Sequence, residues 1–177
     1  MLRTLITLLL LTPAASFAAG SSDSKPPKPT PTSEACEKGQ VWDEHTSECV
    51  DVESHLLDDD ELYGAVREFA YAGRYDDALD ALAAMSNPQD DRVLTYRGFI
   101  ARKEGDFERA MGYYQAALMQ NPDNILARSY MGQGLAAIGD LVAAKAQLTE
   151  IRLRGGRQTW AEYALAQAIE TGITHSY

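Results

Sequence analysis

The sequence predicts an all-α fold of three stacked helical hairpins and a C-terminal capping helix, preceded by a small β-hairpin closed by a disulfide. One observation is a sequence motif that occurs three times. It consists of a glycine, an aromatic residue or leucine two residues later, an alanine three residues after that, and a large apolar residue four residues after the alanine. The alanines recur after 32 and then 34 residues, which is typical of helical-hairpin repeats. A pair of cysteines upstream of the repeats predicts the disulfide. The copies are Gly73, Tyr75, Ala78, Leu82; Gly105, Phe107, Ala110, Tyr114; and Gly139, Leu141, Ala144, Leu148.

Residues 1–18 have the composition of a signal peptide. Arg3 supplies positive charge, an apolar run extends from Leu5 to Leu11, and small residues precede the expected cleavage site after Ala18. A membrane anchor is the alternative interpretation, but this run is too short to cross a hydrocarbon core of about 30 Å as a helix. We therefore expect a periplasmic or secreted protein with no stable membrane insertion after the signal is removed.

Residues 19–33 are expected to form a disordered linker. The segment contains several serines, four prolines and almost no apolar side chains, so it cannot bury a core. It serves either as a tether to a partner or as a tail.

Residues 34–52 contain the only two cysteines of the chain, Cys36 and Cys49. In an exported protein this pair predicts a disulfide, and closing such a loop contributes about 3 kcal/mol. Residues 40–42 and 48–50 are expected to pair as strands around a polar turn. A metal site with His45 is the alternative, although structural zinc requires four ligands. The segment resembles the cysteine-stapled hairpins of secreted proteins, including part of chitin-binding peritrophin-like modules.

The helical part is expected to begin at residue 58. Residues Asp58 to Glu61 would occupy a first helical turn, where free N–H groups and the helix dipole stabilise carboxylates. Calcium binding is the alternative, but three adjacent aspartates lack the alternating spacing of a calcium loop. Leu62, Ala65, Val66 and Phe69 then follow helical spacing.

The second hairpin carries the fullest copy of the repeat. Small residues at Gly98 and Ala110 allow two helices to cross closely, and Phe107 and Tyr114 fill the space beside them. In type and spacing this copy resembles the tetratricopeptide repeat family. The other matching positions are Leu94, Ala101, Gly105, Ala117, Leu118 and Pro122.

The resemblance extends over residues 58–171, with repeats at about 59–90, 91–124 and 125–158 and a cap at 159–171. It implies a right-handed superhelix whose inner face is lined by the first helix of each hairpin. It also implies protein binding without chemistry. The arrangement by which some members of the family clamp a C-terminal carboxylate is not reproduced.

Composition and motifs argue against nucleic-acid binding and against an enzyme. The chain carries 26 Asp and Glu against 16 Lys and Arg, a net charge of −10, so it repels nucleic acids and anionic lipids. None of its three histidines has a nucleophile or a carboxylate at a spacing typical of a catalytic site. No glycine-rich phosphate-binding loop occurs. We therefore expect no cofactor, no metal and no catalytic residues.

Candidate partner-binding residues are those on the first helix of each hairpin that face away from the second helix. They combine four cations with five aromatics, and aromatics with arginine are common anchors of protein recognition. The alternative is that the aromatics only pack against neighbouring repeats. The residues are Tyr63, Arg67, Tyr71, Arg92, Thr95, Tyr96, Phe99, Arg102, Lys103, Ser129, Tyr130 and Gln133.

The sequence thus favours a non-enzymatic adaptor of the cell envelope or of a secretion pathway. It would bind a protein or peptide segment, acidic in character, on the inner face of the repeats. The alternative is a cell-wall or carbohydrate-binding protein, in which Trp42 of the Cys36–Cys49 hairpin stacks on a sugar and the repeats present the hairpin.

Overall fold

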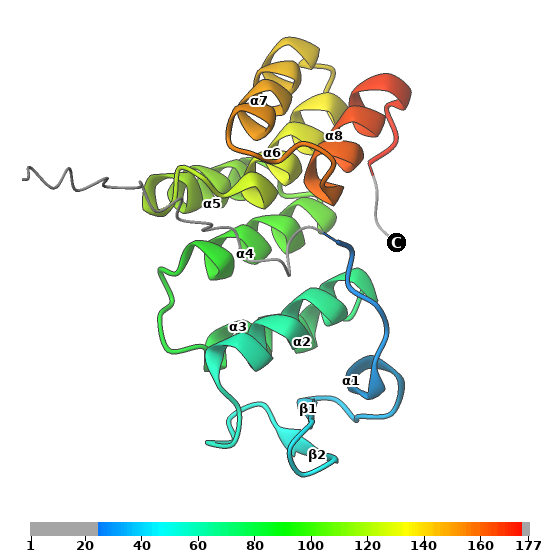
Figure 1. Ribbon diagram of the computed structural model, residues 1–177, viewed down its shortest axis with the longest axis vertical. Helices are drawn as coiled ribbons and strands as arrows, with labels where there is room; N and C mark the ends of the chain where they lie inside the picture. Colours follow the sequence, from blue (N-terminus) through cyan, green and yellow to red (C-terminus); the bar gives the residue numbers. More distant parts are fainter. Residues whose placement is uncertain (1–24, 175–177) are drawn as a thin grey trace, which may run out of the picture.

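The computed structural model describes residues 25–174, which contain eight α-helices and one two-stranded antiparallel sheet (Figure 1). The predicted all-α class with an N-terminal hairpin is confirmed. The expected signal peptide and residues 19–24 of the expected linker lie outside the described residues. The elements are α1 (Pro31–Glu34), β1 (Gln40–Asp43), β2 (Glu48–Asp51), α2 (Asp59–Tyr71), α3 (Tyr75–Ala84), α4 (Asp91–Lys103), α5 (Phe107–Gln120), α6 (Ile125–Ala137), α7 (Leu141–Leu153) and α8 (Trp160–Thr171).

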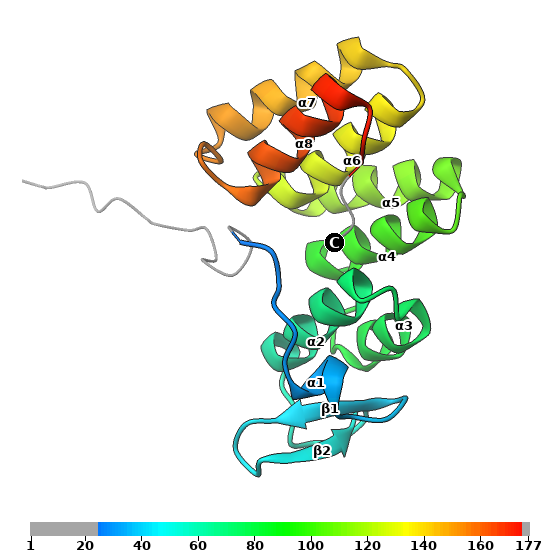
Figure 2. The ribbon, with the colours of Figure 1, turned by 90° about the vertical axis from the view of Figure 1, so that its right-hand side faces the viewer.

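The helices form two layers. Helices α2, α4, α6 and α8 contact one another in sequence along the stack, and α3, α5 and α7 pair with the first three of them (Figures 1 and 2). Each hairpin turns at a glycine with positive φ: 76° at Gly73, 89° at Gly105 and 86° at Gly139. In all three turns the residue after the glycine donates its N–H to a carbonyl five residues earlier, at 2.9 Å. The repeated glycine therefore ends the first helix of each pair, because it adopts the left-handed conformation without steric cost.

The acidic run at residues 58–61 starts a helix. Asp58 caps α2 by accepting N–H bonds from Asp60 and Glu61, while the Glu61 side chain accepts the N–H of Asp58. Asp59 accepts two hydrogen bonds from Ser86. Within residues 25–174, no group of His, Cys, Asp and Glu side chains is arranged to hold a metal ion.

Small residues set the helix crossings. A Cβ atom built on Gly98 of α4 would lie 2.6 Å from the Tyr114 ring of α5, and Tyr114 and Ala110 are both fully buried. Gly132 of α6 has the same relation to Leu165 of α8, again at 2.6 Å. These two glycines let pairs of helices approach to contact distance.

We expect Gly98→Ala to destabilise the fold by about 1–3 kcal/mol, because the added methyl group must displace a fully buried ring. Gly112→Ala is the matched control, since Gly112 lies in α5 with nothing within 4 Å of a built Cβ atom. There, the higher helix propensity of alanine should stabilise the protein by about 0.5–1 kcal/mol. Urea denaturation midpoints measure both changes, and equal midpoints would show that the α4–α5 crossing is looser than described.

The N-terminal hairpin is part of the repeat core. Strands β1 and β2 pair with Trp42 opposite Cys49. The predicted disulfide is present, with Cα atoms 5.6 Å apart, so neither cysteine is a thiolate available to a metal. Val41 and Val52 are buried in the same cluster as the apolar side chains of α2. The hairpin therefore covers the N-terminal end of the stack, as Figure 2 shows.

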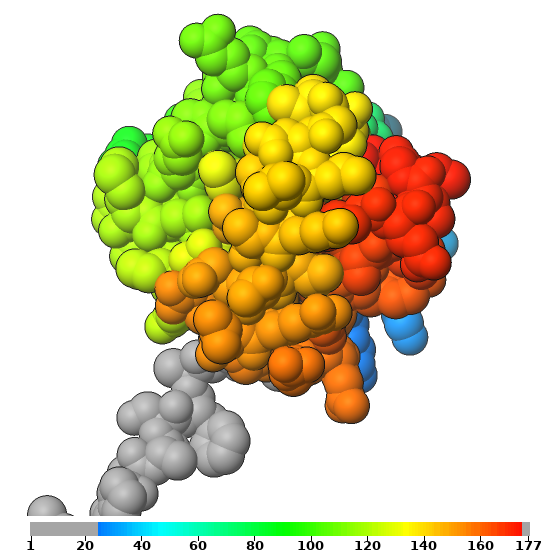
Figure 3. Space-filling view, turned by 90° about the horizontal axis from the view of Figure 1, so that it is seen from above, coloured from blue at the N-terminus to red at the C-terminus, as the bar shows by residue number. Residues whose placement is uncertain are grey.

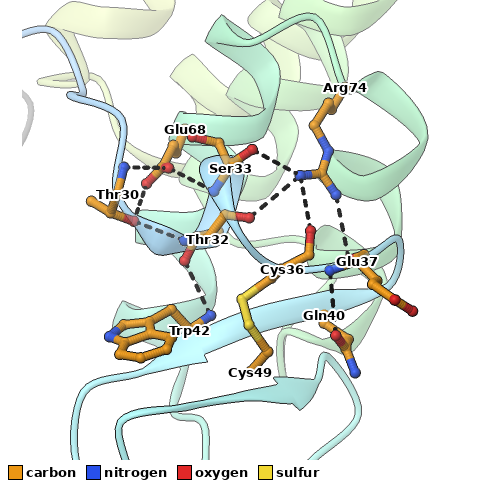
Figure 4. The surroundings of a disulfide bond; sticks show 10 residues. All are labelled: Thr30, Thr32, Ser33, Cys36, Glu37, Gln40, Trp42, Cys49, Glu68 and Arg74. Atoms are coloured by element: carbon orange, nitrogen blue, oxygen red, sulfur yellow. Dashed lines mark hydrogen bonds between the residues drawn. A yellow bond between two sulfur atoms is a disulfide. The ribbon is translucent and has the colours of Figure 1, made fainter.

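The expectation of disorder through residue 33 is wrong for residues 30–33. Thr30 caps α1, and Pro31 is its first residue. The buried carboxylate of Glu68 on α2 accepts three hydrogen bonds from this segment: the Thr30 N–H at 2.7 Å, the Thr30 hydroxyl at 2.8 Å and the Ser33 N–H at 2.9 Å (Figure 4). A buried carboxylate needs such donors, and the segment supplies them by folding onto α2.

A second anchor joins this region to the first repeat. The Arg74 side chain lies 4.6 Å from the centroid of the Phe69 ring, and its Nε donates to Asp77 at 2.8 Å. Its two terminal nitrogens face four main-chain carbonyls at 3.4–3.5 Å, as Figure 4 shows. These carbonyls belong to Thr32, Ser33, Cys36 and Glu37.

Candidate functional site

Burial divides the twelve predicted partner-binding residues into two groups. The expectation that all twelve form a surface is wrong for seven, because their side chains are at most 5% exposed. Those seven are Tyr63, Thr95, Tyr96, Phe99, Ser129, Tyr130 and Gln133. Arg67, Tyr71, Arg92, Arg102 and Lys103 are partly exposed.

The buried aromatics form a continuous ladder between the first helices of the repeats. The Tyr96 ring lies 5.8 Å from Tyr63 on α2 and 5.9 Å from Tyr130 on α6, edge to face in both cases. Phe99 stacks on Tyr71 at 5.7 Å and lies 4.9 Å from Tyr130. These rings therefore pack against neighbouring repeats, which is the alternative that the sequence left open.

A hydroxyl network closes the inner face. The Tyr71 hydroxyl is 2.7 Å from that of Tyr130, which lies 3.4 Å from that of Tyr96. Trp160, the first residue of α8, donates its indole N–H to the Tyr71 hydroxyl at 3.2 Å. Burial raises the pKa of both Tyr71 and Tyr130, so these two phenols are neutral donors and acceptors near pH 7. The network links the first repeat to the last helix across 89 residues of sequence.

Helix α8 covers the inner face of the third repeat. Ser129 donates its hydroxyl to the Ala161 carbonyl at 2.8 Å, and Gln133 donates to the Ser129 oxygen at 3.2 Å. In the space-filling view of Figure 3, α7 and α8 lie over this end of the stack. Ser129 therefore fastens the capping helix to α6, and Gln133 holds the Ser129 side chain in place.

The partly exposed residues lie on α2 and α4. Arg67 donates to the Lys25 carbonyl at 2.7 Å, so the proline-rich segment runs beside α2, as the blue trace of Figure 1 shows. Arg92 forms ion pairs with Asp60 at 2.7 Å and with Asp90 at 3.1 Å. Hydrogen bonds to these carboxylates raise its pKa, so its charge is permanent but already compensated.

Arg102 and Lys103 end α4 side by side. The guanidinium carbon of Arg102 and the ammonium nitrogen of Lys103 each lie 5.6 Å from the centroid of the Phe99 ring. Burial, together with the charge of Arg102, lowers the pKa of Lys103 to about 8. The nitrogens Nε and Nη2 of Arg102 are buried, and the side chain interacts with the Tyr114 hydroxyl.

A cavity of about 490 Å³ lies between the hairpin, the proline-rich segment and α2. Trp42 forms part of its wall, with the ring placed beside α1 in Figure 4. Gly64 and Ala65 of α2 also contribute to the lining. The acidic side chains around it are Glu44, Asp58, Asp60, Glu61 and Glu68.

Sequence reasoning missed three residues that shape these surfaces. Glu68 could have been noticed, because a carboxylate adjoining the apolar positions Val66 and Phe69 needs buried donors. No local pattern signals the contacts of Arg74 with the N-terminal segment or of Trp160 with Tyr71, because these partners lie 37 or more residues away.

Comparisons with known proteins support a binding domain. The sequence profile described as "Tetratricopeptide repeat" matches residues 101–169. The chain is also 30% identical over 101 residues to the "Probable biofilm formation methyltransferase WspC" of Pseudomonas putida strain KT2440. That match covers 56% of this chain and only 24% of the relative, so the methyltransferase name describes the relative alone. No solved structure matches the chain.

Within residues 25–174, no helix is long and apolar enough to cross a membrane.

The repeat family is one of protein–protein interaction scaffolds. The profile match over residues 101–169 and the three glycine-turned hairpins show that the helical part of the chain has the fold of tetratricopeptide repeats.

Proposed function

We propose that the protein is a non-enzymatic adaptor that binds a polypeptide segment along the exposed edge of α2 and α4. The observation that carries this proposal is the band formed by Arg67, Tyr71, Arg102 and Lys103, on helices that line the inner face of the repeats. Three cations and an aromatic ring on a chain of net charge −10 favour an acidic or extended partner. The signal-like residues 1–18 support a place in the cell envelope or a secretion pathway.

Capture from an envelope extract tests the adaptor, with the mature protein as bait. We expect the double variant Arg67→Glu with Arg102→Glu to retain at least about tenfold less of the main partner, because charge reversal opposes encounter and docking. The matched control is Lys145→Glu with Arg157→Glu, which changes the net charge equally at two exposed positions on α7 and in the following turn. Equal capture by the two double variants would contradict the proposal.

A second candidate function, carbohydrate binding, is favoured by the cavity beside Trp42. An aromatic wall with carboxylate acceptors suits a sugar ring, and a volume of about 490 Å³ is within the usual size of small-molecule sites. Trp42→Ala discriminates between the functions. The adaptor predicts unchanged capture of the protein partner, whereas loss of binding to purified wall polymer in this variant supports the second function.

A further inference from the structure

The chain crosses its own proposed binding face before the first helix begins. Residues 25–29, called the strap from here on, run beside α2 in the views of Figures 1 and 2. At one end of the strap, the Lys25 carbonyl accepts a hydrogen bond from the Arg67 guanidinium at 2.7 Å. At the other end, Thr30 donates its N–H and its hydroxyl to the Glu68 carboxylate. Arg67 and Glu68 are neighbours on α2, so both ends of the strap are fastened to one turn of that helix.

Between these two fastenings the strap lies over open space. On the side of the β-hairpin, Pro27 and Lys28 line the cavity of about 490 Å³. On the side of Tyr71, the same two residues line a second cavity of about 100 Å³. All five strap residues are exposed or half-buried. The strap therefore crosses α2 without the close packing that is typical of a core segment.

The strap is held by fewer hydrogen bonds than the residues that follow it. Within the part of the chain that the structure describes, residues 25–29 form one hydrogen bond, the contact with Arg67. Three of the five residues are prolines, which have no N–H to donate. The adjoining residues 30–33 supply three hydrogen bonds to Glu68, and Thr32 is buried. Thr30 is therefore the point at which a firmly held segment meets a detachable one.

We propose that the strap is an autoinhibitory segment, which covers the α2 end of the partner-binding face and must detach before a partner polypeptide binds there. The inference rests on the proposed function, because Arg67 and Tyr71 belong to the face assigned to the partner. While the strap is closed, the Arg67 nitrogen Nη2 is occupied by the Lys25 carbonyl. The strap residues beside Tyr71 also stand in the way of a partner that approaches this ring.

Prolines suit a segment that opens and closes. Their fixed φ keeps the strap extended in both states, so closing costs little conformational entropy. Because the strap belongs to the same chain, its effective concentration at α2 is on the order of millimolar. One net hydrogen bond favours the closed state by a factor of about two to ten. The apparent affinity of a partner falls in proportion to the open fraction, so we expect inhibition of the same size.

Backbone ¹⁵N relaxation of the full chain tests strap closure without any partner. Lys28 lies between two strap prolines, and its amide should have an order parameter above about 0.6 in the unsubstituted chain. In the double variant Pro27→Gly with Pro29→Gly, the value should fall below about 0.6, because glycine removes the fixed φ. A value already below about 0.6 in the unsubstituted chain would mark residues 25–29 as a loose tail and overturn the proposal.

Capture from an envelope extract tests the regulation. The variant Pro27→Gly with Pro29→Gly should retain about two- to tenfold more of the partner whose capture depends on Arg67, because its strap is open more often. The matched control is Pro88→Gly with Pro122→Gly, two exposed prolines in turns outside the strap, which should leave retention unchanged. Equal retention by the two double variants, or a loss in the strap variant, would contradict the proposal.

Lys25→Glu should act in the opposite direction. It replaces a cation next to the Arg67 contact with an anion, so the closed strap gains electrostatic attraction. Partner retention should fall at least about twofold at low salt, and the order parameter of Lys28 should rise. Lys145→Glu makes the same charge change at an exposed position on α7 and should alter neither quantity. Lower retention without a higher order parameter would mean that Lys25 contacts the partner directly, and would overturn the strap.

The strap and the adaptor can fail separately. If a partner is retained through Arg67 and loosening the strap does not increase its retention, the adaptor stands and the autoinhibition is wrong. If the relaxation of Lys28 responds as expected while no extract protein depends on Arg67, the adaptor is wrong and the strap closes a face that no partner uses.

Discussion

Phe99→Ala is expected to destabilise the protein by about 3–5 kcal/mol, among the largest effects of any single substitution in the chain. The Phe99 side chain is fully buried and contacts rings from three helices, Tyr71 on α2, Tyr96 on α4 and Tyr130 on α6. Alanine leaves a cavity that these rings cannot fill without breaking their own contacts. The substitution also removes about 0.5–1.5 kcal/mol of stabilising free energy for each aromatic pair that Phe99 forms.

Urea denaturation of the full chain measures this loss. Val142→Ala is the control, because Val142 is 84% exposed and its truncation should change stability by no more than about 0.5 kcal/mol. A loss below about 1 kcal/mol for Phe99→Ala would show that the aromatic ladder is an exposed surface, as the sequence interpretation had it. The aromatic residues would then again be candidate partner contacts.

The helices and turns were predictable because their signals are local. A glycine that must adopt positive φ, an aspartate that caps the next helix and apolar residues at helical spacing all act within a few residues of one another. The disulfide was predictable for a different reason, since the chain has only two cysteines. Neither argument requires knowledge of how the repeats stack.

The site was only partly predictable. Helical periodicity predicts which residues share one face of a helix, but it does not predict which other element covers that face. Tyr96 and Tyr130 do lie on the inner face, but the hairpins approach closely enough for their rings to meet at 5.9 Å. Ser129 and Gln133 are covered by α8, which returns to the inner layer after the third hairpin. The four cations kept partial exposure because long charged side chains extend to solvent even when their stems are packed.

The N-terminal segment shows the limit of composition as evidence. Its prolines and serines are typical of disordered linkers, yet Thr30 and Pro31 are also a favourable pair for the start of a helix. What decides between the two is a distant residue, Glu68, whose buried carboxylate is satisfied only when the segment folds against α2. A sequence pattern read within the segment contains no trace of that requirement.

Leu165→Ala in α8 should cost about 2–5 kcal/mol, and Gly132→Ala in α6 about 1–3 kcal/mol, for opposite reasons. The first leaves a cavity beneath a fully buried side chain, and the second forces a methyl group to within 2.6 Å of the same leucine. The double variant places the new methyl group in the space that the leucine vacates. Its loss should therefore be smaller than the sum of the single losses, with a coupling of about 0.5–3 kcal/mol.

Urea denaturation of the four proteins in this cycle measures the coupling. Strict additivity would mean that α8 does not pack on α6 as described, and that the inner face of the third repeat is open to a partner. The coupling also bears on function. If α8 unfolds only together with the other helices, it keeps Ser129 and Gln133 covered and inaccessible to a partner protein. Native-state hydrogen exchange of the Leu165→Ala variant should then show α6 and α8 losing protection together, whereas loss from α8 alone would make it a displaceable lid.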